Sequence, residues 1–201
     1  MAKNVKIIST ETLSDNFFPL KNVKYEIRKN DDSTEELTRE VYCSANGATV
    51  LLYNTSTNKV LLTRQFRMPT FINNNPSGML IEACAGLLEE NEDPKEGMIR
   101  EIEEETGYKV QHVRKVFELY STPGCVSEML HYFVAEYTND QRVSNGGGLA
   151  TESEDIEVIE MPFDDAWLKV ESGEIKDAKT VILLQYAKLN LFQEEKVFDI
   201  L

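Results

Sequence analysis

Nine acidic residues lie within the twenty-three positions GLLEENEDPKEGMIREIEEETGY, from Gly86 to Tyr108. Three of them, Glu101, Glu104 and Glu105, follow an i, i+3, i+4 spacing that places their carboxylates on one face of a helix. Like charges at this spacing repel each other, so helix stability alone does not favour the arrangement. Hard divalent cations such as Mg²⁺ prefer oxygen ligands of this kind. The stretch is therefore either a solvated acidic helix face or a metal site.

A helix over residues 94–106 is needed to present these carboxylates together. Asp93 is a favourable N-cap, Pro94 suits the first helical position, and Glu96 stands at the capping-box spacing. Gly107 is a favourable stop at the carboxyl end of the helix. The apolar face of this helix would consist of Met98, Ile99 and Ile102.

Strands and hairpins are predicted on both sides of this helix. Residues 47–67 have the pattern of strand, turn and strand, with NTSTN as the turn, and residues 79–86 form a third, mostly apolar strand. This order of elements predicts an α/β (α+β) fold with a mixed sheet rather than a doubly wound one. Further strands are expected over 116–120, 128–138 and 155–163, and helices over 164–175 and 177–192.

Residues 1–45 form a separate, β-like segment. They contain short runs of alternating or β-branched apolar residues, interrupted by polar turns such as NDDST. This is too little sequence for a core of its own, so we expect the segment to lean on another domain or another subunit. The predicted boundary therefore divides the chain into 1–45 and 46–201.

Composition excludes several classes of function. The chain has 201 residues and a formal net charge of −14, which repels nucleic acids and anionic lipid surfaces, so neither is an expected partner. Cys43, Cys84 and Cys125 are odd in number and form no CxxC pair, which argues against a disulfide framework. The chain has only two histidines, His112 and His131, which argues against a zinc site built from histidines. Without a signal-like or membrane-length apolar run, we expect a cytoplasmic protein.

The acidic stretch matches a known motif at every fixed position. The Nudix box has the pattern G-x5-E-x7-R-E-U-x-E-E-x-G-U, in which U is a bulky aliphatic residue. Ile102 fills the first U, and Tyr108 replaces the aliphatic residue at the last one. On this motif the chain resembles the Nudix hydrolases, which implies an α/β/α sandwich with a mixed sheet. The matching residues are Gly86, Glu92, Arg100, Glu101, Glu104, Glu105 and Gly107.

The resemblance extends along about 190 residues beyond the box itself. SDNFF, TREVY, GATVLLYN, RQFR, IEACAGLLE, FELYSTPG, AEYTNDQR and GEIKDAKTV resemble segments of the GDP-mannose pyrophosphatases, a branch close to the ADP-ribose pyrophosphatases. Members of this branch are homodimers in which the N-terminal β segment crosses to the partner and helps to build its site. This would explain why residues 1–45 lack a core of their own.

The resemblance implies a metal site and assigns its ligands. Glu101 and Glu105 would bind Mg²⁺, with Mn²⁺ possible, and the backbone carbonyl of Ala85 would complete the cluster. Glu104 would be a third-site or water-mediated ligand and part of the catalytic set. Arg100 would hold the carboxylates in place through charge-assisted hydrogen bonds rather than touch the substrate.

A glycine-rich segment, SNGGGLATESEDIEV over residues 144–158, is expected to supply a further carboxylate. Three glycines followed by acidic residues predict a mobile loop. By resemblance, Glu154 is the loop glutamate that binds metal and helps to activate water, with Glu152 as the alternative. Glu92 would brace the loop of the box against its helix.

The substrate would be held by residues from both chains of the dimer. Phe17 and the strand Thr38–Glu40 would reach into the partner's site; relatives prefer tyrosine at position 17 and a basic residue at position 38. Arg67 would meet the diphosphate or the sugar phosphate, and Glu128 would lie at the metal-bound diphosphate. The full set of expected substrate-binding residues is Phe17, Thr38, Arg39, Glu40, Arg67, Ala85, Gly86, Leu87, Glu128 and Lys179.

The implied activity is Mg²⁺-dependent hydrolysis of a nucleotide sugar, GDP-mannose, to GMP and mannose 1-phosphate. The alternative is an ADP-ribose pyrophosphatase that releases AMP and ribose 5-phosphate. Pro123 lies sixteen residues after Gly107, a placement that both branches share, so it does not decide between them. Two further readings are a non-catalytic Nudix binding module and an acidic partner-binding protein, and the intact box argues against the module.

Overall fold

The computed structural model describes residues 4–149, 151 and 154–192. The chain divides into two compact units, and the first takes in a second segment beyond the amino-terminal region delineated from the sequence. The first unit is Met1–Gly47 with Glu118–Leu130, and the second is Ala48–Phe117 with His131–Leu201.

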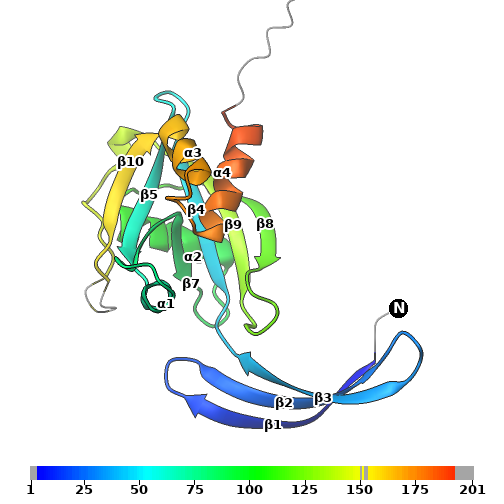
Figure 1. Ribbon diagram of the computed structural model, residues 1–201. Helices are drawn as coiled ribbons and strands as arrows, with labels where there is room; N and C mark the ends of the chain where they lie inside the picture. The colour runs from blue at the N-terminus through cyan, green and yellow to red at the C-terminus, as the bar shows by residue number, and fades with distance from the viewer. Residues whose placement is uncertain (1–3, 150, 152–153, 193–201) are drawn as a thin grey trace, which may run out of the picture. The chain divides into compact units, whose positions relative to one another are not determined.

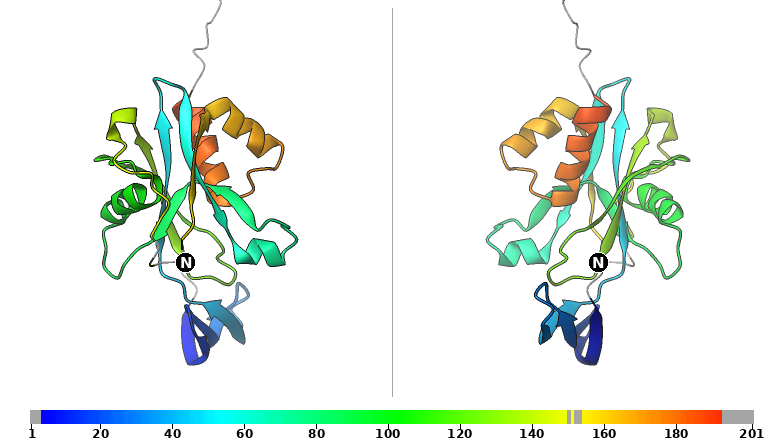
Figure 2. Two further views of the ribbon diagram at one scale, coloured as in Figure 1. Left: turned by 90° about the vertical axis from the view of Figure 1, so that its left-hand side faces the viewer. Right: turned by 90° about the vertical axis from the view of Figure 1, so that its right-hand side faces the viewer.

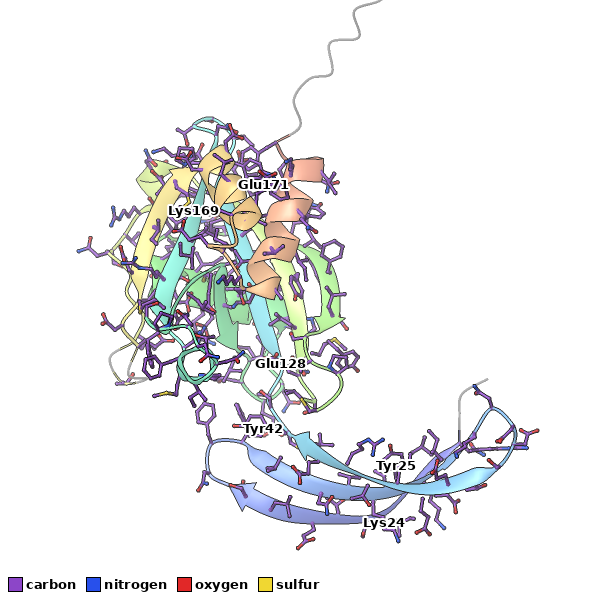
Figure 3. The ribbon with its side chains drawn as sticks, in the orientation of Figure 1. Lys24, Tyr25, Tyr42, Glu128, Lys169 and Glu171 are labelled. Carbon is purple, nitrogen blue, oxygen red and sulfur yellow. The ribbon has the colours of Figure 1, made fainter. Side chains whose placement is uncertain are left out.

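The first unit contains an antiparallel sheet in the order β1-β2-β3, formed by Val5–Asp15, Pro19–Arg28 and Thr34–Tyr42. Every residue of these strands is described, and none has a buried side chain. The neighbouring side chains of Lys24 and Tyr25 point to opposite faces of the sheet (Figure 3). Both faces of the sheet are therefore open, as expected for a segment without its own core.

The segment 118–130 attaches to the end of this sheet through backbone hydrogen bonds. Tyr42 donates to the carbonyl of Cys125 at 2.8 Å and accepts from the amide of Ser127 at 3.1 Å. Tyr42 and Val126 thereby form a parallel bridge. These contacts explain why residues distant in the sequence belong to the first unit.

The second sheet has seven strands, arranged as β10-β5-β4-β9-β8, with β6 paired to β5 and β7 paired to β4 (Figure 1). The hairpin of β4 and β5 is confirmed: Asn58 adopts a positive φ and the Asn54 side chain accepts from the amide of Thr57. The strands are β4 Gly47–Asn54, β5 Lys59–Phe66, β6 Met79–Glu82, β7 Cys84–Leu87, β8 Arg114–Tyr120, β9 Met129–Glu136 and β10 Glu157–Pro162.

Helices cover both faces of this sheet: α2 lies on one side, and α3 and α4 on the other (Figure 2). The predicted α/β/α sandwich is therefore confirmed. The buried residues of α4 are Thr180, Leu183, Leu184 and Ala187, an i, i+3, i+4, i+7 stripe that faces the sheet. The helices are α1 Met68–Ile72, α2 Pro94–Glu101, the π-helix η1 Ile102–Thr106, the 3₁₀ turn η2 Asn139–Gln141, α3 Phe163–Glu171 and α4 Ala178–Asn190.

Two details differ from the sequence prediction. The single strand predicted over 79–86 breaks at Ala83, because the Ala83 amide donates at 2.6 Å to the Thr180 hydroxyl on α4. The two halves, β6 and β7, then pair with different neighbours. The short helix α1 was not predicted; it begins immediately after Arg67, with Pro69 in its first turn.

The side of the sheet that faces α2 holds a continuous apolar core. Met98 and Ile102, which the sequence assigned to the apolar face of the box helix, are both fully buried there. Their burial fixes which helix face is left for the carboxylates. Among the described residues, no helix has the length and apolar composition needed to span a bilayer.

Candidate active site

The acidic stretch folds as a capped helix whose last turn is wider than the rest. The side chain of Asp93 accepts from the amides of Lys95 and Glu96, at 2.9 and 3.3 Å, and Pro94 occupies the first helical position. After Glu101 the backbone continues as the π-helix η1, which ends at Gly107 with φ 75°. Single π-helical turns within helices are frequent at functional sites.

Arg100 connects three of the box glutamates. Its guanidinium lies 2.9 Å from Glu101, 2.9 Å from Glu104 and 3.4 Å from Glu92. Glu92 also accepts from the amide of Glu89 at 2.9 Å, which fixes the loop that precedes the helix. Burial alone would lower the pKa of Arg100, but its hydrogen bonds and charge interactions with the carboxylates raise it. Arg100 and Glu92 thus link the loop before the box helix to the carboxylates on that helix.

Glu105 is the most deeply buried carboxylate of the cluster, with 1% of the residue exposed. Its Oε2 accepts from the amide of Ala85 on β7 at 3.2 Å. Its other oxygen, Oε1, is buried and has no hydrogen-bond partner among the described residues. A buried carboxylate oxygen without a partner is costly, so a ligand that paired with this atom would remove an energetic penalty.

Glu101 lies directly against the backbone of Gly86. A Cβ atom on Gly86 would stand 2.0 Å from Cδ of Glu101 and 2.2 Å from its Oε1. The box requires glycine here because any side chain would displace this carboxylate. Gly86 therefore shapes the pocket that holds Glu101, while the neighbouring Leu87 is partly exposed at the end of β7.

The glycine run 146–148 packs against the π-helix. The amides of Gly147 and Gly148 donate to the carbonyls of Glu105 and Glu104, at 2.9 and 3.1 Å. All three glycines have positive φ, a conformation that other residues rarely adopt. These bonds satisfy carbonyl groups that the end of a helix leaves open. The loop expected from the sequence is thus fixed to the helix at its glycines.

This packing brings Glu154 to the cluster. Its Oε2 accepts from the amide of Leu149 at 3.0 Å, and its side chain lies against Gly148. Its charge raises the pKa of both Glu101 and Glu105. Glu152, the alternative carboxylate, lies outside the described residues.

The electrostatics of the cluster favour a bound cation or proton. Burial raises the pKa of Glu101 to about 7, and the carboxylates of Glu104 and Glu154 add to the effect while Arg100 opposes it. Burial raises the pKa of Glu105 to about 8, with further contributions from Glu101 and Glu154. Two carboxylates that resist ionisation side by side are stabilised by a positive charge between them.

The donor set suits a hard divalent cation. The cluster offers carboxylate oxygens, one of them without a partner, and no imidazole takes part. Within the described part of the chain, no group of three or more His, Cys, Asp and Glu side chains is arranged so that it could hold a metal ion. The set expected from the sequence also includes a backbone carbonyl, that of Ala85, and Glu101 is engaged with Arg100. A cation at this cluster would therefore need ligands beyond these side chains.

A second charged cluster joins β5, β6 and α4. Arg67 donates to Oε2 of Glu82 from Nε at 3.0 Å and from Nη2 at 2.7 Å. Lys179 lies 3.3 Å from the other oxygen of Glu82 and 3.0 Å from Asp177. Two predicted substrate-binding residues, Arg67 and Lys179, thus meet on one carboxylate.

Sequence reasoning missed Glu82. The available signal was a single charged residue inside the apolar strand MLIEACAG. Asp177 and Thr180, which fix the start of α4 beside it, were missed as well: the Asp177 side chain accepts from the Thr180 amide at 2.9 Å.

The remaining predicted residues belong to the first unit. Phe17 is 78% exposed and its ring packs edge-on against Phe18, with 4.6 Å between centroids. Thr38, Arg39 and Glu40 lie on β3, opposite residues 22–24 of β2. Glu128 lies between β8 and β9, within the segment 118–130 (Figure 3). All of these residues are described by their places within the first unit.

Comparison with protein-family models gives two adjacent matches. Residues 44–184 match the NUDIX domain, and residues 4–42 match the N-terminal domain of the GDP-mannose pyrophosphatase NudK.

Curated relatives match nearly the whole chain. Proteins named GDP-mannose pyrophosphatase are 50% identical over 186 residues in Escherichia coli O9:H4 (strain HS) and 51% identical over 189 residues in Cronobacter sakazakii (strain ATCC BAA-894). These alignments cover 92% and 94% of this chain and 96% and 97% of the relatives. A crystal structure described as an ADP compounds hydrolase shares the fold, with a TM-score of 0.66, 18% identity and 90% of each chain covered.

Proposed function

The chain belongs to the Nudix family, and we propose that it hydrolyses the diphosphate bond of GDP-mannose to give GMP and mannose 1-phosphate. Relatives of about half-identical sequence carry the name GDP-mannose pyrophosphatase along almost their full length. The observation that carries the proposal for this chain is the unpartnered, buried oxygen of Glu105 within an intact box. A binding module would have no use for this costly arrangement.

Nudix hydrolases generally need divalent metal ions, and we propose Mg²⁺ here. Glu101, Glu105, Glu154 and the carbonyl of Ala85 would hold it. When bound, the cation would neutralise the diphosphate and favour the loss of a proton from water. This would also reconcile an anionic substrate with a protein of net charge −14.

The other roles in the reaction are assigned to individual side chains. Glu154 is the proposed general base, because its carboxylate lies at the cluster on a segment that is tied to the box helix. Arg100 keeps Glu101 and Glu104 in place at 2.9 Å each, so the cluster does not need to rearrange when substrate arrives. Arg67 and Lys179 would bind the diphosphate or the sugar phosphate, and Gly86 and Leu87 would line the same site.

We also propose a homodimer in which the first unit of one chain completes the site of its partner. The support is the open three-stranded sheet, the exposed ring of Phe17, and the family match over residues 4–42. Phe17, Thr38, Arg39 and Glu40 would contact the partner's substrate in this way, and Glu128 would lie at the metal-bound diphosphate. The three cysteines are all free, which suits the reducing cytoplasm that we propose as the location.

Product analysis tests the activity directly. The purified protein is incubated with Mg²⁺ and, separately, with GDP-mannose, ADP-ribose, ADP-glucose and NADH, and the products are separated by anion exchange. We expect selective conversion of GDP-mannose to GMP, which disappears when EDTA is added. A preference for ADP-ribose would keep the diphosphate chemistry and refute the substrate, and no turnover of any compound would refute the activity.

A further inference from the structure

Glu82 has an environment that its place in a β-strand does not explain. It is the one charged residue of β6, and only 3% of its side chain is exposed. Its carboxylate accepts from Nε of Arg67 at both oxygens, at 3.3 and 3.0 Å, and from Nη2 at 2.7 Å, and it lies 3.3 Å from the ammonium of Lys179. Arg67 follows β5 and Lys179 lies in the first turn of α4, so one carboxylate links two elements that are far apart in the sequence.

Stabilisation of the fold does not by itself explain a buried carboxylate at position 82. A buried ion pair has a desolvation penalty that often equals or exceeds its attraction, and apolar replacements of similar volume are frequently neutral or stabilising. The neighbours of Glu82 along the strand are apolar, so an apolar residue would suit this position. The presence of a carboxylate therefore calls for a role beyond packing.

Exposure increases from the carboxylate to the cations around it. The side chain of Glu82 is 3% exposed, that of Lys179 is 14% exposed and that of Arg67 is 39% exposed. Arg67 uses Nε and Nη2 on Glu82, which leaves Nη1 outside this pair of bonds. The carboxylate is thus the inner anchor, and the cations are the groups that a ligand can reach.

The position of Lys179 is fixed from a second side. Asp177 caps α4 by accepting from the amide and the hydroxyl of Thr180, at 2.9 and 2.5 Å, and it also pairs with Lys179 at 3.0 Å. The Thr180 hydroxyl in turn accepts from the amide of Ala83, the residue after Glu82. The start of α4 is therefore held against the end of β6, and Lys179 has little freedom to leave Glu82.

We propose that Glu82 is a positioning residue, which holds Arg67 and Lys179 side by side so that both bind the same phosphate-bearing part of the substrate. The inference rests on the proposed function, because that function gives the two cations their ligand. A bidentate carboxylate fixes the plane of a guanidinium, and it also offsets the repulsion between two neighbouring cations. Without it, the same charges would remain but would no longer converge.

The variant E82Q tests this role, because it removes the charge and keeps the shape of the side chain. Steady-state kinetics with GDP-mannose and Mg²⁺ should show a KM raised about tenfold and a kcat within about threefold of wild type, since charge-assisted bonds of this kind add to binding. The control is E160Q: Glu160 also holds two donors, Lys59 and Tyr137, but lies on β10. It should leave KM unchanged.

A merely structural role predicts a different result. It would reduce the fraction of folded enzyme, so E82Q would lower kcat and the melting temperature while KM stayed constant. Epistasis separates the two roles further: in an R67A background, E82Q should raise KM by a clearly smaller factor than in wild type, because only Lys179 is left for Glu82 to position. An additive effect of E82Q in that background, or an unchanged KM in the single variant, would overturn the inference.

Two further variants cover the case in which E82Q does not fold. R67K keeps the positive charge but cannot form the two parallel bonds to Glu82, so it should raise KM by a similar factor. E82D keeps the charge on a shorter arm and should fall between wild type and R67K. Wild-type KM in both would overturn the inference. If wild type and E160Q hydrolyse GDP-mannose, such a failure concerns Glu82 alone; if neither does, the proposed function fails first.

Discussion

The residues expected to act on substrate fall in two regions that are built in opposite ways. In the second unit, Glu105 is buried and Glu101 is half-buried, and the two are fixed by Arg100, Gly86 and the amide of Ala85. In the first unit, Thr38, Arg39 and Glu40 lie on an open sheet, and Phe17, between β1 and β2, is largely exposed. One region has its geometry before any ligand arrives, and the other presents exposed side chains.

The difference between the two regions predicts how substitutions affect activity and stability in each. Buried carboxylates with unmet oxygens cost stability and are kept for chemistry, so their removal should spare or even strengthen the fold. Exposed residues of the sheet contribute little to the fold of a single chain, so their removal should leave it unchanged. Substitutions in both regions should therefore affect activity far more than stability, but by different routes.

The largest effect is expected for Glu105→Gln. The amide cannot provide the charge that holds a divalent cation, so turnover of GDP-mannose should fall by at least about 100-fold. The melting temperature in EDTA should stay equal or rise, because the costly buried charge is gone. Kinetics and thermal unfolding measure both quantities.

The matched control is Glu103→Gln on the same turn, whose exposed side chain pairs only loosely with Lys109 at 3.6 Å. Wild-type turnover in Glu105→Gln would refute the metal assignment.

A smaller loss is expected for Gly86→Ala. The added Cβ would stand 2.0 to 2.5 Å from the carboxylate of Glu101 and would force it out of the cluster. We expect kcat to fall by about 10- to 100-fold, the range seen when groups that orient metal ligands are lost. Gly124→Ala is the control, because a Cβ there would meet nothing within 4 Å. Equal activity of the two variants would show that Glu101 does not need its present position.

The sequence predicted the box helix well because its signals are local. Asp93, Pro94 and Gly107 act within a few residues, and they mark its two ends in the structure. The π-helical turn was not predicted, since five residues are too few to separate its period from that of an α-helix. It coincides with the docking of Gly147 and Gly148, which are about forty residues away in the sequence.

Long-range pairing explains the other omissions. Glu82 looked like an isolated charge because its partners, Arg67 and Lys179, approach it only after the sheet and α4 have assembled. The break at Ala83 depends on a hydroxyl from α4, which no local pattern contains. Residue identity thus predicted the chemistry of the box, while the second charged cluster required the fold.

An intermediate effect, in the other region, is expected for Phe17→Ala. Stacking of a base on an aromatic ring is worth roughly 1–3 kcal/mol, so KM for GDP-mannose should rise about tenfold. The melting temperature should barely change, because the ring is 78% exposed. Leu168→Ala is the control, since this exposed apolar side chain lies on α3 in the second unit. Steady-state kinetics and thermal unfolding measure both variants.

Mixed dimers show whether Phe17 acts in its own chain or in the partner. A dimer of one Phe17→Ala chain and one Glu105→Gln chain has one intact metal site, in the Phe17→Ala chain, and receives an intact Phe17 only from the partner. Co-expressed and separately tagged chains should therefore show wild-type KM at about half the wild-type activity per dimer. If KM stays at the value of Phe17→Ala, the ring does not cross between chains.

The smallest expected effect is the pH dependence of the stabilisation that Mg²⁺ gives through the carboxylate cluster. Their raised pKa values, about 7 for Glu101 and about 8 for Glu105, mean that the metal-free folded protein binds more protons than the unfolded chain between pH 4.5 and 8. The contribution of these groups to the free energy of unfolding is therefore fully present below about pH 4.5 and is lost progressively as pH rises from there to about 8. A cation replaces those protons and needs ionised ligands, so its stabilisation should increase over the same window.

We expect Mg²⁺ to raise the melting temperature by about 5 °C at pH 8.5 and by much less at pH 6. Glu105→Gln should abolish most of this difference, whereas Phe17→Ala should leave it intact, because the open sheet takes no part in the carboxylate cluster. A shift of equal size at both pH values, or one that survives in Glu105→Gln, would place the cation elsewhere in the molecule.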